Sequence, residues 1–103
     1  MFTIIYSFQV KPGEATPFEK AWRDLTVLIY ENEGSLGSRL HKQADLSYIA
    51  YAQWPDRDTW KNSGSKMPEK SKDISKAMKA SCEKVETLYE LEVVDDLLVT
   101  NRD

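Results

Sequence analysis

Residues 35–54 read SLGSRLHKQADLSYIAYAQW, and this stretch predicts the hairpin around which the fold is built. Its two strands are residues 35–43 and 47–54, joined by a short turn at residues 43–46. Pro55 closes the second strand, because proline lacks the backbone N–H that a sheet interior needs. The hairpin indicates an antiparallel sheet to which the remaining elements must be added.

The chain before this hairpin predicts another strand, residues 2–10. Its side chains alternate with the period of two that is typical of a strand with one buried face. The apolar face carries Phe2, Ile4, Tyr6, Phe8 and Val10. Residues 11–13, Lys-Pro-Gly, are a turn signal and end the strand.

A long helix is expected from Thr16 to Asn32. Thr16 and Glu19 have the spacing of a capping box, and Pro17 takes the first helical position, where its missing N–H costs nothing. Apolar residues recur at steps of three and four and form one stripe, made of Phe18, Ala21, Trp22, Leu25, Leu28 and Ile29. Gly34 then ends the helix as a C-cap residue would.

The chain after the hairpin predicts two helices and a last strand. Asp56 is a candidate N-cap for a short helix near residues 56–62, and Ser-Gly-Ser at residues 63–65 breaks it. A second helix runs from residue 68 to about residue 83. Residues 85–94 form the last strand, whose apolar side chains again alternate.

The resulting order, β-α-β-β-α-β, predicts an α+β fold of ferredoxin-like topology. Such a split βαβ arrangement gives a four-stranded antiparallel sheet with its helices on one face. The length of 103 residues suits a single domain, residues 1–103, with a core of about residues 2–94 and a C-terminal tail of residues 95–103.

The second face of this sheet is too apolar to stay in water. It carries Ile5 and, depending on the register of the hairpin, either Ile49 with Tyr51 or Tyr48 with Trp54. A second copy of the chain would cover it, so we expect a homodimer. The apolar residues 97–99 either reach across to that partner or pack locally.

Composition excludes several classes of protein. The net charge is −3, and Glu69, Asp73 and Glu83 are mixed in with the six lysines of residues 61–79, so a solvated helix face explains these lysines better than nucleic-acid binding. No apolar run approaches the roughly 20 residues that span a membrane, and the N-terminus lacks a signal-peptide pattern, which predicts a cytoplasmic protein. One histidine and one cysteine cannot form an ordinary zinc site, and Cys82 is expected to be a packed thiol.

Three segments carry a resemblance to a known family. They are Val10-Lys11-Pro12-Gly13, Glu33-Gly34-Ser35-Leu36-Gly37 and the strand that ends in Trp54-Pro55. With the element order, they resemble the antibiotic biosynthesis monooxygenase family over residues 2 to about 94. The resemblance implies a dimeric α/β barrel, in which the sheets of two subunits form the barrel, and a cavity between sheet and helices in each subunit. It also implies, for several members, oxygenase activity on phenols, anthrones or hydroquinones without a bound metal or organic cofactor.

Other members of that family degrade haem, and this chain departs from them. They use an Asn, a Trp and a His at positions that correspond here to Tyr6, Ser63 and about Asp73. All three are replaced, which argues against haem degradation by that route. Many relatives also have a Glu where this chain has Ala52.

Three residues are candidates for catalysis. His41 is the only histidine, and it shares a strand face with Arg39, so that His41 could be the base and Arg39 could hold the resulting anion if this face is the cavity. The alternative is that both make ordinary hydrogen bonds at a sheet edge. Tyr6 either donates a hydrogen bond to a ligand oxygen or is a buried tyrosine bonded to the backbone.

Five further residues are candidates for substrate binding. Trp22, Trp54 and Trp60 would suit a flat aromatic ligand, although large aromatic residues are often only core. Asn62 and Ser63 lie at a helix break and are either polar contacts or caps. The sequence thus predicts a cofactor-independent monooxygenase of a small aromatic phenol or quinol, with neither metal nor cofactor. A non-catalytic binding or interaction module, or an isomerase or lyase of the same fold, is the alternative.

Overall fold

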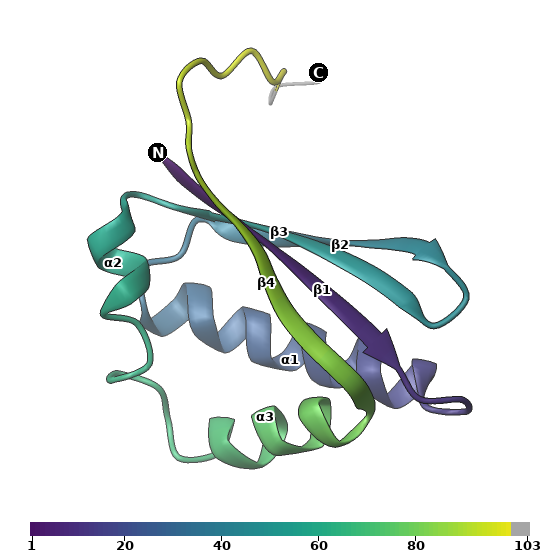
Figure 1. The fold of residues 1–103 in the computed structure, drawn as a ribbon. Helices are drawn as coiled ribbons and strands as arrows, with labels where there is room; N and C mark the ends of the chain where they lie inside the picture. The colour runs from purple at the N-terminus through teal and green to yellow at the C-terminus, as the bar shows by residue number, and fades with distance from the viewer. Residues whose placement is uncertain (100–103) are drawn as a thin grey trace.

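A computed structural model describes residues 1–99 of the chain. Figure 1 shows the order of the elements, which are β1 (Phe2–Val10), α1 (Ala15–Asn32), β2 (Gly37–Ala44), β3 (Ser47–Trp54), α2 (Arg57–Lys61), α3 (Ser71–Ala80) and β4 (Cys82–Glu92). The predicted tail is therefore described only to Val99, and residues 100–103 lie outside the described part of the chain. None of the described helices is long and apolar enough to cross a membrane.

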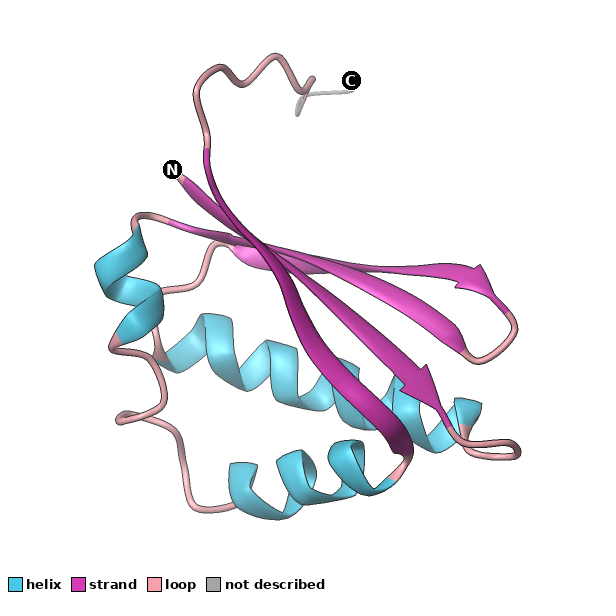
Figure 2. Ribbon diagram, viewed as in Figure 1, coloured by secondary structure: helices cyan, strands magenta, loops and turns pink. Residues whose placement is uncertain are grey.

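The four strands form one sheet in the order β2-β3-β1-β4, and every neighbouring pair is antiparallel. In Figure 2 the helices α1 and α3 lie together on one side of this sheet, and α2 lies beside the end of β3. These observations confirm the predicted α+β class and the ferredoxin-like order of elements. After β4 the chain continues close to the N-terminus, where the Val93 N–H donates to the Met1 carbonyl at 2.9 Å.

The register of β1 against β3 decides which side chains face the helices. Tyr6 pairs with Ala50, and Ile5 pairs with Tyr51. Alternate residues of β3 are buried under the helices, namely Tyr48, Ala50, Ala52 and Trp54. The outer face of the sheet therefore carries Ile5, Ile49 and Tyr51, which is one of the two arrangements that the sequence left open.

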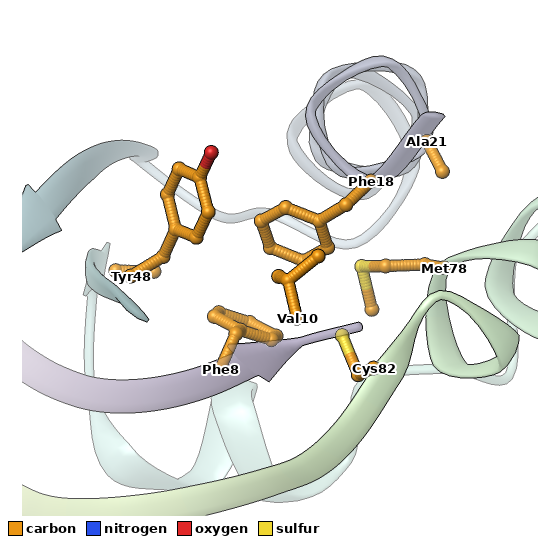
Figure 3. Packing of buried hydrophobic residues seen from close by; sticks show 8 residues of the cluster. Phe8, Val10, Phe18, Ala21, Tyr48, Met78 and Cys82 are labelled. Carbon is orange, nitrogen blue, oxygen red and sulfur yellow. The ribbon is translucent and has the colours of Figure 1, made fainter. Parts of the chain in front are cut away.

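One end of the space between sheet and helices is tightly filled. We call it the packed end, and its buried residues are Phe8, Val10, Phe18, Ala21, Tyr48, Ala50, Met78 and Cys82. Figure 3 shows the ring of Phe18, on α1, between those of Phe8 and Tyr48, with centroid distances of 5.1 and 4.9 Å. The helices α1 and α3 and the strands β1, β3 and β4 contribute to this cluster. Cys82 is a packed thiol here, as predicted, and burial raises its pKa.

The other end, which we call the cavity end, is built differently. Its buried hydrophobic residues are Phe2, Ile4, Ala52 and Trp54, all from the two central strands. Tyr6, Ile29 and Trp60 pack against them but stay partly exposed. Within residues 1–99, no helical residue belongs to this buried hydrophobic cluster.

Several element boundaries differ from the prediction. The helix α1 begins one residue early, with Glu14 as its N-cap and no side-chain cap, so the capping box of Thr16 was wrong. The Phe18 N–H donates to the Glu14 carbonyl at 2.9 Å, which makes Glu14 the start of the first turn. Pro17 is still tolerated, because the first helical N–H groups have no partner in the helix.

The helix α3 is shorter than expected, and β4 starts earlier. The Ser81 hydroxyl donates to the Met78 carbonyl at 2.7 Å and ends α3. Cys82 then pairs with Val10 in the sheet, where the sequence pattern had continued the helix. Gly34 has a φ of +81°, a left-handed conformation that glycine adopts without strain, so the predicted end of α1 is confirmed.

Candidate functional site

A cavity of about 660 Å³ opens at the cavity end. Its volume lies within the range of roughly 300–1,000 Å³ that is usual for small-molecule sites. Its walls come from β1, β3, α1, α3 and the segment of residues 62–70. Its lining residues include Tyr6, Leu25, Ile29, Glu33, Trp54, Trp60, Ser63, Met67, Lys72, Lys76 and Lys79.

A second cavity of about 260 Å³ adjoins the first one. The two share six lining residues, Tyr6, Leu25, Ile29, Trp54, Ser75 and Lys79. The second cavity reaches Trp22 of α1 and Ser38 of β2. Together they form one aromatic-lined space between the sheet and the helices.

Tyr6 lines both cavities, and its hydroxyl oxygen already accepts a hydrogen bond. The Trp60 indole N–H donates to that oxygen at 3.0 Å, so the hydroxyl is not bonded to the backbone. Its own proton has no acceptor among residues 1–99. Burial raises the pKa of Tyr6, the Trp60 hydrogen bond opposes the rise, and Glu90 adds to it. Tyr6 therefore stays neutral near pH 7 and can donate to an oxygen atom of a ligand.

Trp54 offers a second donor without a partner. Its side chain lines both cavities, although the residue is only 4% exposed. Its indole Nε1 is the only fully buried side-chain nitrogen or oxygen in residues 1–99 that has no hydrogen bond. A buried donor without an acceptor costs free energy, which a ligand oxygen could offset.

Glu33 is the only carboxylate that lines either cavity within the described chain. It is 8% exposed, and its Oε2 accepts the Lys66 N–H at 2.8 Å. Sequence reasoning treated this residue only as part of a motif. A signal was available, because a carboxylate at the C-terminus of a helix opposes the helix dipole and is not placed there for helix stability.

Lys72, Lys76 and Lys79 were also missed. They lie on α3 at steps of four and three, so they share one side of the helix and border the larger cavity. The sequence analysis assigned them to a solvated helix face, and they are indeed exposed. Their periodic spacing could have shown that they face one surface together.

The structure brings together most of the predicted binding residues. Trp54, Trp60 and Ser63 line the larger cavity, and Trp22 lines the smaller one, while Asn62 lines neither. The Ser63 hydroxyl donates to the Trp60 carbonyl at 2.6 Å, and the Asn62 N–H donates to the Asp58 carbonyl at 2.9 Å. Both residues thus close the end of α2.

Arg39 and His41 lie elsewhere. They pair across β3 with Tyr51 and Ile49, which places them on the outer face of the sheet. His41 Nδ1 is 3.1 Å from the Ile49 carbonyl oxygen. Both border a separate groove with the tail residues Leu97 and Leu98. They were predicted to act only if they lay on the cavity face, and within one subunit they do not lie on it.

The described residues contain no group of three or more His, Cys, Asp or Glu side chains that could hold a metal ion. The polar groups that line the aromatic space are instead the Tyr6 hydroxyl, the Glu33 carboxylate, serine hydroxyls and a rim of lysine amines. This set can bind an oxygenated aromatic molecule, accept a proton from it and stabilise the anion that results.

Comparison with known proteins supports the fold. No curated protein sequence matches the chain. A variant of SnoaB, a cofactor-independent oxygenase from Streptomyces nogalater, is similar in structure, with a TM-score of 0.74 and 20% identity over 93% of this chain and 95% of that one. A Caulobacter crescentus protein assigned to antibiotic biosynthesis monooxygenases has a TM-score of 0.68 and 25% identity, over 88% and 90% of the two chains. A protein from Nitrosomonas europaea with the same assignment has a TM-score of 0.74 and 12% identity, over 92% and 100%.

The family profile described as antibiotic biosynthesis monooxygenase matches residues 1–66, which include the first three strands, α1 and α2. The matched segment contains Tyr6, Glu33, Trp54 and Trp60 of the cavity. The lysines of α3 lie beyond it. This protein therefore belongs to the antibiotic biosynthesis monooxygenase family.

Proposed function

We propose that this protein is a cofactor-independent monooxygenase that acts on a small aromatic phenol or quinol. The observation that carries the proposal is the neutral Tyr6 hydroxyl, which lies in an aromatic-lined cavity with its proton free to bond a substrate oxygen. Membership of the family supports an oxygenase, and the similar structure of SnoaB, a cofactor-independent oxygenase, supports a reaction without a cofactor.

The reaction balances without an outside reductant. A quinol loses a proton and becomes an electron-rich anion, which passes an electron to O2 and then forms a carbon–oxygen bond with it. One oxygen atom stays in the product, which is a hydroxylated quinone, and the other leaves as water with two hydrogens of the substrate. The substrate itself is oxidised, so all the electrons that reduce O2 come from it.

Two side chains have roles in this scheme. Glu33 is the cavity carboxylate and takes the first proton, in the place that the sequence analysis gave to His41. Tyr6 donates its proton as a hydrogen bond to the substrate oxyanion, which stabilises the charge as it forms.

We also propose a homodimer with the outer face of the sheet at its centre. Ile5, Ile49 and Tyr51 form an apolar surface there, and the same face of β4 adds Tyr89 and Leu91, which are 60% and 45% exposed. Exposed apolar area of this kind marks an interaction site. Sedimentation equilibrium should give a dimer for the natural sequence and a monomer for Tyr89→Asp. A natural chain that sediments as a monomer would refute this assembly.

Oxygen uptake tests the proposed activity. Anthrone, 1-naphthol and 1,4-naphthohydroquinone would be added to the protein with and without a chelator, and the excess over the uncatalysed rate would be measured. We expect oxygen uptake that the chelator does not affect. With labelled O2, one labelled oxygen atom should appear in the product. Glu33→Gln should lower the rate about a hundredfold, since general-base catalysis contributes roughly 10²–10⁴.

Glu31→Gln is the matched control, because Glu31 is exposed on the same helix and lines neither cavity. Its rate should equal that of the natural protein. The absence of histidine from the cavity lining of the described chain favours a non-catalytic binding module as the second candidate. Saturable binding without any turnover would support that candidate, and turnover that persists without O2 would indicate an isomerase or lyase.

A further inference from the structure

Three lysines of α3 border the larger cavity. Lys72, Lys76 and Lys79 follow one another at helical steps, and Lys79 lines the smaller cavity as well. The only acid in the lining of either cavity, within residues 1–99, is Glu33. The rim of the aromatic space is therefore positively charged.

The stability of α3 does not explain this arrangement. Lys72 lies in the first turn of the helix, where the helix dipole places partial positive charge and disfavours a cation. Lys76 is four residues after Lys72 and three before Lys79, and like charges at these spacings repel one another across the helix surface. Lys79 lies in the last turn, where the dipole favours a cation, so the stability of the helix accounts for Lys79 but not for Lys72 or Lys76.

Neighbouring acids neutralise this charge only in part. Lys72 Nζ is 3.3 Å from Glu69 Oε1, but the two side chains are 75% and 87% exposed, and such surface pairs contribute little. Lys76 and Lys79 make no ion pair within residues 1–99. Asp73 lies on the same helix but does not line the cavity, and Glu33 is held by the Lys66 N–H.

The interior of the cavity complements this rim. Trp60 and the other aromatic side chains offer flat apolar surfaces, while Tyr6 and Trp54 each have a hydrogen-bond donor without an acceptor in the described chain. Apart from Glu33 and the serine hydroxyls, the polar side chains of the lining are thus donors or cations. Such a site matches a ligand that has oxygen acceptors on an aromatic ring and a negative charge at one end.

We propose that the substrate of this cavity is an aromatic acid, a phenol or quinol that carries a carboxylate or similar anionic group held by Lys76 and Lys79. The inference rests on the proposed function, and it adds the charge of the substrate to it. The ring lies among the tryptophans, and the anionic group lies at the rim beside α3. The family profile matches only residues 1–66 and carries no information on the charge of the substrate, because the lysines lie outside that segment.

The test compares two probes that differ only in the acid group, 3-hydroxy-2-naphthoate and 2-naphthol. Isothermal titration calorimetry would give the dissociation constant of each for the natural protein, for the double variant Lys76→Gln/Lys79→Gln, and for Lys61→Gln. Lys61 is the matched control, because it is an exposed lysine of α2 that makes no ion pair with any residue of the described segment 1–99 and lines neither cavity. Circular dichroism would establish that all the variants are folded.

We expect the natural protein and Lys61→Gln to bind the acid about tenfold more tightly than naphthol, as two partly exposed charge contacts of about 0.7 kcal/mol each would give. The double variant should bind both probes alike. The preference should also shrink in 0.5 M salt, since screening weakens exposed charge interactions.

Equal binding of both probes by the natural protein would overturn the inference, and so would a preference that survives in the double variant or a failure of both probes to bind. These outcomes are separable from the failure of the proposed function. Oxygen uptake with neutral naphthohydroquinone reports the reaction and not the charge preference. Oxygen uptake together with equal binding of the two probes would support the oxygenase activity and refute only the preference for an acidic substrate.

Discussion

The two ends of the space between sheet and helices differ in what fills them. At the packed end, Phe18 of α1 and Met78 of α3 meet the strands, and no side chain of the cluster is more than 8% exposed (Figure 3). At the cavity end, the buried set comes from the strands alone, and Tyr6, Ile29 and Trp60 remain partly exposed around an open space.

This difference shows how a small domain can be stable and still hold a ligand. Its closely packed half contributes most of the apolar burial, which is the main favourable term in folding. The other half gives up packing and places indoles, a phenol and a carboxylate around a space. The predictions below test whether stability and ligand binding are separated in this way.

The largest effect on stability is expected at the packed end. Phe18 is fully buried, and Phe18→Ala should lower the free energy of unfolding by about 3–5 kcal/mol, because the ring contacts are lost and a cavity remains. Ile29→Ala, beside the open space at the cavity end, should cost about 2 kcal/mol or less. Urea denaturation followed by circular dichroism measures both. Equal losses would contradict the division of the molecule into two ends.

Tyr6→Phe tests the cavity end, where turnover should be affected more than stability. The variant lacks the acceptor for Trp60 and the donor for the substrate, so turnover should fall about tenfold or more while stability falls by about 1 kcal/mol. Oxygen uptake and urea denaturation measure the two quantities. Tyr30→Phe is the control, since Tyr30 is exposed on α1 and lines neither cavity. A rate that is unchanged in Tyr6→Phe would remove Tyr6 from the site.

Tyr48, at the packed end, should make the stability of the protein depend on pH in the alkaline range. Its hydroxyl donates to Glu19 Oε2 at 2.6 Å, and this bond raises the pKa of Tyr48 to about 12. The phenol of an unfolded chain ionises near pH 10, so the folded state holds the proton more tightly. This contribution to stability is complete below about pH 10 and is lost as the pH rises toward about 12.

Tyr48→Phe should therefore lower the free energy of unfolding by about 1 kcal/mol at neutral pH, where the hydrogen bond is intact. The difference between the natural protein and the variant should disappear between about pH 10 and about pH 12. Urea denaturation across this range measures it. A constant difference would show that the bond to Glu19 does not set the pKa.

The smallest effect is expected for His41→Ala. His41 is exposed on the outer face of the sheet, so stability should change by no more than about 0.5 kcal/mol, and binding of naphthol in the cavity should stay the same. Urea denaturation and calorimetry check these expectations. A large loss of turnover would instead show that His41 takes part in the reaction, which the sequence favoured only for a position on the cavity face.

The fold was predictable because its signals are local. The alternation in β1, the stripe of α1, the turn after β1 and Gly34 each depend on neighbouring residues, and the order of the elements then leaves few topologies. The errors occurred where a tertiary contact overrode a local pattern. Cys82 fits the helical pattern of α3, but its pairing with Val10 places it in β4.

The candidate site was predictable only in part. The tryptophans and Tyr6 could be named because large aromatic residues on apolar faces lie inside, and the interior is where the cavity is. Glu33 and the lysines of α3 were missed, because their positions look like an ordinary helix end and a solvated face. Only the packing of α3 and residues 62–70 against the strands turns them toward one space.

The amino-acid sequence by itself determined the α+β class, the order of the strands along the chain and the family, since these follow from local periodicity and short motifs. The tertiary structure alone decided which sheet face each hairpin residue takes. A shift of one residue in the register of β2 and β3 would exchange the two faces. The register that is observed buries Tyr48 and Trp54 and sends Arg39 and His41 outward. The identity of the cavity residues was settled by that pairing, because a side chain's face depends on a partner strand and not on its own neighbours.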